Sequence, residues 1–305
     1  MFTLIENGEL YAPQPLGPQS ILVANDVIGR IGRDLTVVGL EAAGLAPDVI
    51  DASGCVVTPG FIDPHEHLLG GSGERGFSSQ TPEISLTEIV SVGITTVVGC
   101  LGVDTTTKTL PGVLAKAKGL KEEGLNSHIF SGGYNVPPTT ITSSIRDDVI
   151  FIDEVIGAGE TAIADQRSSQ ASVSELARLV CDAHNGGILA RKSGVTHFHV
   201  GPGESRLSSL RHLLDSFDVE PAWLYPTHIT RSEALIKEAV EHSRRGGFVD
   251  MDTVDENLPR CLRLHLDDGG DLNKLTVSSP GQTFCMNRSE RVCKTASRWR
   301  TRSLW

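Results

Sequence analysis

The chain has 305 residues, of which 39% are apolar and 21% charged, a composition typical of globular proteins that bury a large core. Its net charge of −11 argues against a general nucleic-acid surface, which would be basic. No apolar stretch approaches the roughly 20 residues of a membrane helix, and the first residues do not resemble a secretory signal. We therefore expect a cytoplasmic protein with reduced cysteines and with no nucleic-acid or membrane partner.

Residues 1–58 are expected to form a small β unit. They contain short segments rich in Val, Ile and Leu, which are separated by Asn, Asp and Gly. This alternation is typical of strands joined by tight turns.

From residue 56 the pattern changes to strands that alternate with helices, and the expected second domain spans residues 59–280. The expected strands are 56–63, 95–102, 128–133, 161–165, 196–201, 223–230, 247–253 and 275–279. Near-continuous apolar strands that alternate with helices indicate a parallel sheet covered on both faces. Eight such units predict an α/β fold of the (β/α)8 TIM-barrel type.

Residues 281–305 differ from the rest of the chain. They are rich in arginine, hold a single acid, Glu290, and show neither helical nor strand periodicity. We expect an unrelated basic tail without stable structure, and an (β/α)8 barrel that lacks its last helix.

Polar residues gather at the ends of the predicted strands. His65 and His67 end the first strand, Glu160 precedes the fourth, and His199 and His228 end the fifth and sixth. Active sites of such barrels lie at the carboxyl ends of the strands, and imidazole and carboxylate are common ligands of zinc. A metal site is therefore the preferred interpretation.

A single histidine at a strand end is more often a hydrogen-bonded polar residue than a ligand. His197, two residues before His199, is a further candidate by spacing alone. The remaining histidines are expected at the surface: His128, His184, His212, His242 and His265.

Several motifs recur in order at separations typical of one enzyme family. They read PGFIDPHEHLLGGSGERG, TPEISLTEIVSVGITTVVGCLG, SGGYNVPPTTITSSI, AIADQRSS, GVTHFHVG and PTHITRSEALIKEAV. They resemble the bacterial isoaspartyl (β-aspartyl) dipeptidases of the amidohydrolase superfamily. The similarity covers roughly residues 5–279.

The resemblance implies a barrel with an attached β-sandwich, to which residues 1–58 would contribute a part. It implies two divalent metal ions, zinc in most relatives, with His65 and His67 on one ion and His199 and His228 on the other. A hydroxide shared by the ions would attack the β-aspartyl peptide carbonyl. Relatives also form oligomers, so a homo-oligomer is implied.

The resemblance also assigns substrate contacts. Glu74 matches the residue that binds the free α-amino group of the dipeptide, and Tyr134 matches the hydroxyl that stabilises the oxyanion. Arg167 and Arg231 match carboxylate clamps, a role suited to a planar guanidinium. Without the resemblance, solvated loop charges and a packing tyrosine would be the simpler interpretation.

The chain departs from the family pattern at three positions. Glu160 stands where relatives carry a carboxylated lysine that bridges the ions, and a carboxylate can serve the same purpose. Val103 replaces a threonine that contacts substrate. Pro280 follows Ser278 and Ser279 where relatives have the aspartate that binds metal and passes a proton to the leaving amine.

These departures leave alternatives open. The chain is an impaired dipeptidase, a non-catalytic relative that binds metal or substrate, or an unstable splice fragment. A frameshift or a splice variant would explain the change after Ser279. Within the enzymes, a dihydroorotase- or hydantoinase-like cyclic amidase is the alternative, because those enzymes share the His-x-His motif.

Overall fold

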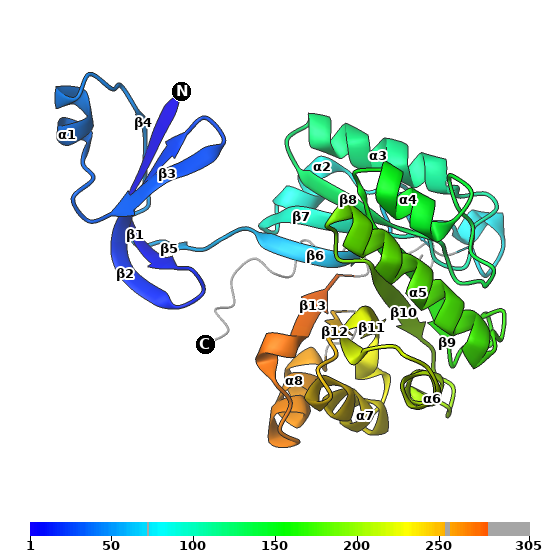
Figure 1. Cartoon of the computed structure of the whole chain (residues 1–305). Helices are drawn as coiled ribbons and strands as arrows, with labels where there is room; N and C mark the ends of the chain where they lie inside the picture. Colours follow the sequence, from blue (N-terminus) through cyan, green and yellow to red (C-terminus); the bar gives the residue numbers. More distant parts are fainter. Residues whose placement is uncertain (72, 254–256, 280–305) are drawn as a thin grey trace. The chain divides into compact units, whose positions relative to one another are not determined.

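A computed structural model defines residues 1–71, 73–253 and 257–279 of the chain. The chain divides into two compact units, Met1–Gly60 and the part from Phe61 onward (Figure 1). The division lies two residues beyond the predicted boundary between residues 58 and 59. The predicted basic tail, residues 281–305, and Pro280 lie outside the described residues. In the described ranges, no helix combines the length and the apolar character needed to cross a lipid bilayer.

The N-terminal unit contains one five-stranded sheet with the order β3-β2-β1-β4, and β5 also pairs with β1. Its elements are β1 (Phe2–Tyr11), β2 (Pro15–Ala24), β3 (Val27–Gly32), α1 (Val37–Ala42), β4 (Asp48–Asp51) and β5 (Val56–Val57). A small core of Leu4, Leu35 and Leu40 joins the sheet to α1. No second sheet packs on this one within Met1–Gly60, so the predicted partial sandwich is represented by a single layer.

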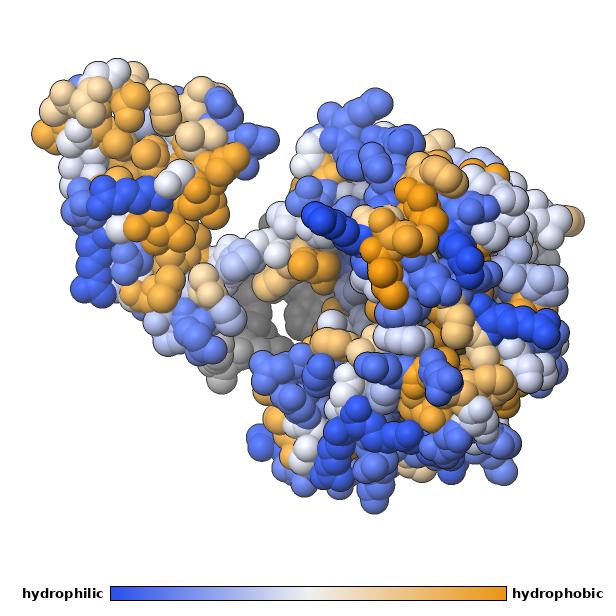
Figure 2. All heavy atoms as spheres, viewed as in Figure 1, coloured by the Kyte–Doolittle hydropathy of each residue, from blue (hydrophilic) through white to orange (hydrophobic). Residues whose placement is uncertain are grey.

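Large apolar side chains remain exposed on this unit, as the visible face in Figure 2 shows. Val27 and Ile28 on β3 are each 60% exposed, and Ile50 on β4 is 51% exposed. Exposed apolar residues that gather on one sheet are unusual for a sheet that is fully covered.

The larger unit contains eight parallel strands, as predicted. They are β6 (Phe61–Glu66), β7 (Ile94–Gly99), β8 (Asn126–Ser131), β9 (Val155–Ile163), β10 (Val195–Val200), β11 (Leu224–Thr227), β12 (Val249–Asp252) and β13 (Leu275–Ser278). The first six form one sheet in chain order, and β12 pairs with β13. The expectation of a TIM-like barrel is confirmed.

Side chains connect the two sheets into a ring. Thr227 at the end of β11 donates a hydrogen bond to Asp250 of β12, with 2.6 Å between Oγ1 and Oδ2. Ser279, which follows β13, donates its backbone N–H to Oδ2 of Asp63 on β6 at 3.1 Å. The eighth strand therefore lies beside the first, which encloses the barrel interior.

Helices cover the outside of this ring (Figure 1). The α-helices are α2 (Leu86–Val90), α3 (Leu110–Glu122), α4 (Ile145–Phe151), α5 (Val173–Ala190), α6 (Ser208–Ser216), α7 (Glu233–Arg244) and α8 (Leu258–Asp267). Short 3-10 helices are η1 (Phe77–Ser79), η2 (Pro221–Trp223), η3 (Ile229–Arg231) and η4 (Leu272–Lys274). The described chain ends after β13, so it includes no helix that follows the eighth strand.

The helices begin where the sequence provides capping groups. Ser172 and Glu175 form a reciprocal capping box at the start of α5, and Ser85 and Glu88 do the same for α2. The apolar residues of these helices then pack against the strands in two large clusters, one around α3 and α4 and one around α6 and α7.

Two expectations about position were wrong. Glu160 lies inside β9, which begins at Val155, and not in front of the strand. His242 and His265 are buried, at 5% and 0% exposure, and not at the surface. Each of these two histidines lies near the C-terminal end of a helix, α7 or α8.

Candidate metal centre

His65 and His67 lie at the carboxyl end of β6 and both point into the barrel. Alternate residues of an extended chain face the same side, which explains how the spacing of two brings them together. Their ring centroids are 5.1 Å apart, and both side chains are buried. The backbone N–H of His65 donates to Oδ1 of Asp63 at 3.1 Å, which fixes the chain where the strand ends.

The carboxylate of Glu160 lies between four histidines. Its Oε1 is 3.5 Å from Nε2 of His67, and its Oε2 is 3.7 Å from Nε2 of His65. The same Oε2 is 3.0 Å from Nδ1 of His199 and 3.5 Å from Nε2 of His228. The structure therefore unites five of the residues singled out from the sequence around one buried carboxylate.

A glycine allows β9 to hold Glu160 at this place. Gly159 has a φ of +141°, and a Cβ at this position would lie 2.7 Å from the carbonyl oxygen of His197 on β10. Burial alone would raise the pKa of Glu160, but the neighbouring imidazoles, led by His65 and His199, lower it well below its usual range. Glu160 is therefore an anion surrounded by imidazoles.

A chain of hydrogen bonds sets the tautomer of His65. The carbonyl oxygen of Tyr225 can only accept, so Nδ1 of His197, 3.0 Å away, carries a proton. Burial lowers the pKa of His197 to about 3, so its Nε2 is bare and accepts from Nδ1 of His65 at 2.7 Å. Nε2 of His65 then presents a lone pair to Glu160. His197, which sequence spacing suggested as a ligand, thus supports His65.

His228 is held from its other side by a second carboxylate. Its Nδ1 lies 2.7 Å from Oδ2 of Asp252, which is the last residue of β12. The backbone of His228 has a φ of +62°, in the left-handed region, just after β11. Burial by itself lowers the pKa of His228, but Asp252 and Glu160 raise it to about 9. The contact with Asp252 leaves Nε2 directed at Glu160.

His199 connects the carboxylate to Tyr134 and Arg167. The Tyr134 hydroxyl is 2.8 Å from Nδ1 of His199, and burial raises the pKa of Tyr134 well above its usual value. Nε2 of His199 is 3.1 Å from Oδ2 of Asp165. Asp165 also accepts from Arg167, with 2.9 Å between Nε and Oδ1 and 2.6 Å between Nη2 and Oδ2.

Of the residues predicted to bind substrate, two are paired with each other and one is exposed. Arg167 donates from Nη1 to Oε1 of Glu74 at 2.7 Å, so these two are already paired. Arg231 is exposed and makes no ion pair with a described residue. Val103 is partly buried beyond β7. Pro280, the position of the missing aspartate, lies outside the described residues.

Three polar residues of the site were missed in the sequence: Cys100, Asp165 and Asp252. The signal that identified the histidines could have found them, because each lies at the carboxyl end of a strand. Cys100 directly follows β7, Asp165 follows β9, and Asp252 ends β12. Asp165 lies within the motif AIADQRSS, and Cys100 lies within TTVVGCLG.

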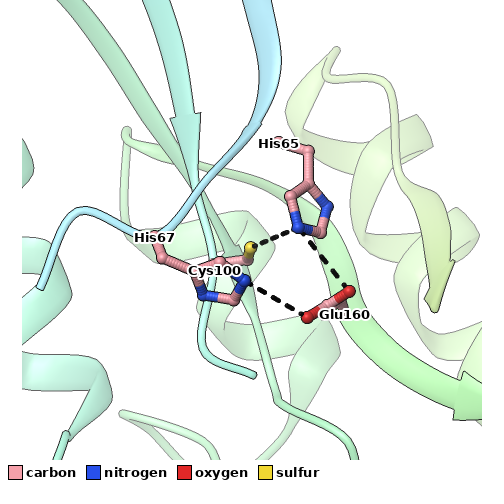
Figure 3. Close-up of side chains that lie close together, drawn as sticks. All are labelled: His65, His67, Cys100 and Glu160. Carbon is pink, nitrogen blue, oxygen red and sulfur yellow. Dashed lines mark hydrogen bonds and ion pairs between the residues drawn. The ribbon is translucent and has the colours of Figure 1, made fainter. Parts of the chain in front are cut away.

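The donor atoms fit divalent metal ions. One group consists of His65, His67, Cys100 and Glu160 (Figure 3). A second consists of Glu160, His199 and His228, and the donors of each group lie within 4.8 Å of one another. Ligands at about 2.0–2.3 Å around a tetrahedral ion lie roughly 3.3–3.8 Å apart. In addition, Oε1 of Glu160 is buried and accepts no hydrogen bond from a described residue.

The fold and its residues are similar to those of a solved dipeptidase. The β-aspartyl dipeptidase of Fervidobacterium islandicum AW-1, solved in complex with a β-Asp-Leu dipeptide, superposes with a TM-score of 0.88. It is 37% identical, and the match covers 93% of this chain and 73% of that one. A D-hydantoinase structure superposes with a TM-score of 0.56 at 18% identity, which shows a shared fold alone.

Curated relatives match over shorter segments. A D-hydantoinase of Geobacillus stearothermophilus is 41% identical over 68 residues, which is 22% of this chain and 13% of that protein. An imidazolonepropionase of Bacillus cereus is 40% identical over 76 residues, which is 24% of this chain and 18% of that protein. The chain thus spans less than a fifth of these two relatives in the matched regions, and no protein-family model matches it. On the similarity along nearly its whole length to the solved dipeptidase, the chain belongs to the β-aspartyl dipeptidase family of the amidohydrolases.

Proposed function

We propose that the chain binds two zinc ions and β-aspartyl dipeptides, and that it hydrolyses these dipeptides slowly. His65 and His67 would hold one ion, and His199 and His228 the other. Glu160 would bridge the two ions in place of the carboxylated lysine of relatives. A cytosolic location and a homo-oligomer are part of the same prediction from the sequence.

The division of the Glu160 carboxylate between two sets of histidines carries this proposal. Oε1 faces His67 at 3.5 Å, whereas Oε2 faces His199 at 3.0 Å and His228 at 3.5 Å. A buried anion with histidines on both sides is the arrangement expected of a bridging ligand. Bound zinc would polarise the peptide carbonyl and lower the pKa of a water at this centre.

Tyr134 is suited to donate a hydrogen bond to the developing oxyanion. Its pKa is raised well above the usual value by burial, so the hydroxyl keeps its proton at neutral pH. The hydroxyl lies 2.8 Å from Nδ1 of the predicted ligand His199, which supports this role.

The charges of a β-aspartyl dipeptide match the paired residues beside the centre. Arg167 is oriented by Asp165 and by Glu74, and a guanidinium held in this way is preorganised to bind a carboxylate. Glu74 would bind the free α-amino group, and the exposed Arg231 would bind the second carboxylate. Because Arg167 and Glu74 are already paired, the substrate must redistribute this contact when it binds.

The family resemblance indicates that the group which protonates the leaving amine is replaced in this chain. Relatives use an aspartate at the position of Pro280, and proline offers neither a proton nor a ligand atom. Losing a general acid or base costs about 10²–10⁴ in rate. We therefore expect binding of metal and dipeptide with little turnover, and an entirely non-catalytic relative is the limiting case.

A cyclic amidase is the second candidate. It is favoured by the local matches to D-hydantoinase and imidazolonepropionase, which cover 22–30% of the chain. The match to the dipeptidase covers 93% of the chain at 37% identity. The sequence resemblance at Glu74, Tyr134 and Arg231 also favours the dipeptidase. The dipeptidase is therefore the better-supported proposal.

Purified chain loaded with zinc, assayed with β-Asp-Leu, hydantoin and dihydroorotate, tests this proposal. We expect slow release of leucine from β-Asp-Leu and no ring opening. Hydrolysis of a cyclic amide in preference to the dipeptide would contradict the proposal. A chain that shows no cooperative thermal unfolding would instead support the unstable-fragment alternative.

A further inference from the structure

A thiol lies next to the first set of predicted ligands. Cys100 follows β7 directly and is 2% exposed, and its Sγ is 3.9 Å from Nε2 of His65. Figure 3 shows the sulfur, the two imidazoles of His65 and His67 and the carboxylate of Glu160 directed toward a common centre. The four donor atoms all lie within 4.8 Å of one another.

A buried oxygen shows that this group has free coordinating capacity. Oε1 of Glu160 is fully buried and accepts no hydrogen bond from the described residues. Nδ1 of His65 lies 2.7 Å from Nε2 of His197, whereas Nε2 of His65 faces Glu160 and Cys100. The imidazole therefore turns its second nitrogen toward the group.

The distances suit a tetrahedral ion. His65 Nε2 lies 3.7 Å from Glu160 Oε2 and 3.9 Å from Cys100 Sγ, and His67 Nε2 lies 3.5 Å from Glu160 Oε1. Zinc–nitrogen bonds of about 2.0–2.1 Å and zinc–sulfur bonds of about 2.3 Å place neighbouring ligands roughly 3.3–3.8 Å apart. The other donor pairs lie within 4.8 Å, so the four side chains would have to move closer together to form a closed four-ligand site.

We propose that Cys100 is the fourth protein ligand of the ion held by His65, His67 and Glu160. This inference rests on the proposed function, because it concerns one of the two ions of that centre. Relatives have a carboxylate from the residue equivalent to Pro280 near this ion, and a thiolate restores the second negative charge. When the ion binds, the S–H bond breaks, a metal–sulfur bond forms and the proton passes to solvent.

A sulfur ligand changes which metals the site prefers. Thiolate favours zinc and other thiophilic ions over magnesium, calcium and manganese, which favour oxygen ligands. Four protein ligands also close the coordination sphere, as in structural zinc sites, whereas catalytic sites keep an open position. The ion beside Cys100 is therefore expected to be structural, and the ion on His199 and His228 more exchangeable.

Cobalt substitution tests the inference directly. We expect the full chain titrated with Co²⁺ to develop a sulfur-to-cobalt charge-transfer band in the near ultraviolet. The band should reach its plateau at one equivalent per chain. In Cys100→Ser the band should be absent, and the affinity for this ion should fall by at least 10–100-fold, which is roughly the loss seen when a residue that only hydrogen-bonds to a ligand is changed.

Cys181→Ser is the matched control, because Cys181 is a free, partly buried thiol on α5 outside the site. This variant should keep the band. The sulfur band is first measured on the unaltered chain. The presence or absence of a sulfur ligand can therefore be judged even if Cys100→Ser does not fold. Cobalt binding without a sulfur band would overturn the role of Cys100 alone. A chain that binds no cobalt would overturn both this inference and the proposed function.

Discussion

Glu160 is the residue on which the candidate centre depends. Its two oxygens face histidines from β6, β10 and the end of β11, so it is the only described carboxylate shared by both donor groups. A buried carboxylate that bridges two cations supplies negative charge to both of them. Removing its charge should therefore affect both ions together.

Glu160→Gln should abolish high-affinity binding of both zinc ions, because an amide is a weak ligand and leaves the two groups without a shared anion. Metal content after dialysis measures this loss. In the presence of zinc, the unfolding temperature of the variant should fall to that of the metal-free chain. Glu66→Gln is the matched control. Burial and Asp63 raise the pKa of Glu66 well above its usual value, so this variant should retain both ions.

Asp252 is expected to act through His228 as a positioning residue. Asp252→Asn can still accept the hydrogen bond from Nδ1, whereas Asp252→Ala cannot, so the alanine variant should lose roughly 10–100-fold in affinity for the second ion. The asparagine variant should lose less. Competitive titration with a chelator measures both affinities. Equal loss in the two variants would show that charge, and not orientation, is the contribution of Asp252.

At the scale of elements, the strand pattern was predictable and the strand bounds were less so. All eight predicted barrel strands overlap observed strands, because buried parallel strands are rich in apolar residues. β9 begins at Val155, six residues before the predicted start, and the additional residues include Gly157 and Gly159. In the structure these glycines allow close approach to β10, where a Cβ on Gly157 would lie 2.3 Å from the carbonyl oxygen of Val195.

The buried histidines at two helix ends share a pattern that sequence reasoning did not use. His242 and His265 are each followed five residues later by a glycine whose backbone N–H donates to the histidine carbonyl. A Cβ at Gly247 or Gly270 would lie 2.1 or 2.2 Å from the histidine Nε2. Each ring therefore packs over a glycine in a turn of the type that ends helices.

Gly247→Ala should lower the free energy of unfolding by about 1–3 kcal/mol, because the methyl group would displace His242 from its hydrogen bond with the Leu224 carbonyl. Gly119→Ala is the matched control. Gly119 lies in α3, and a Cβ there would meet nothing within 4 Å. It should stabilise the chain by about 0.5–1 kcal/mol through helix propensity. Denaturant unfolding of both variants measures the difference, and destabilisation by both would contradict the packing argument.

An ion pair connects α3 to the start of β9. Lys121 and Lys118 lie 3.0 and 3.1 Å from the carboxylate oxygens of Glu154. Burial on its own raises the pKa of Glu154, but the two lysines lower it to about 2. A lowered pKa stabilises the fold above the unfolded value of about 4.5, and this stabilisation is lost as the pH falls toward 2.

Glu154→Gln should therefore destabilise the chain by about 1–2 kcal/mol at neutral pH and by less at pH 3. Urea unfolding at the two pH values measures the change. Lys116→Gln, which alters a more exposed pair with Glu83, should have a small effect at both. An effect of Glu154→Gln that does not depend on pH would contradict the proposed ion pair.

At the scale of the whole molecule, the sequence predicted the barrel and brought five of the site residues to attention. It did not predict which residues hold those ligands in place, because His197, Asp165 and Asp252 act through contacts between strands distant in sequence. The family resemblance supplied the substrate roles of Glu74, Arg167, Tyr134 and Arg231, which no periodicity could indicate. Those roles, the zinc identity and the cytosolic location stay predictions.

The apolar surface of the N-terminal unit bears on the behaviour of the whole chain. Val27, Ile28 and Ile50 are at least half exposed on a single sheet, and exposed apolar sheet surface favours association. Metal binding would stabilise the larger unit by mass action, whereas the exposed apolar side chains belong to the N-terminal unit. Metal content and association should therefore be measured separately.

We propose that the chain keeps the histidines that the family resemblance assigns to metal binding, carries Glu160 in place of the carboxylated lysine of relatives, and has Pro280 where relatives have the aspartate that completes the reaction. The ratio of kcat for β-Asp-Leu between Pro280→Asp and the unaltered chain, both loaded with zinc, tests this most directly. We predict an increase of about 10²–10⁴, the contribution of a general acid or base. If both proteins hydrolysed β-Asp-Leu as fast as the F. islandicum dipeptidase assayed beside them, the proposed loss of the catalytic carboxylate would be contradicted.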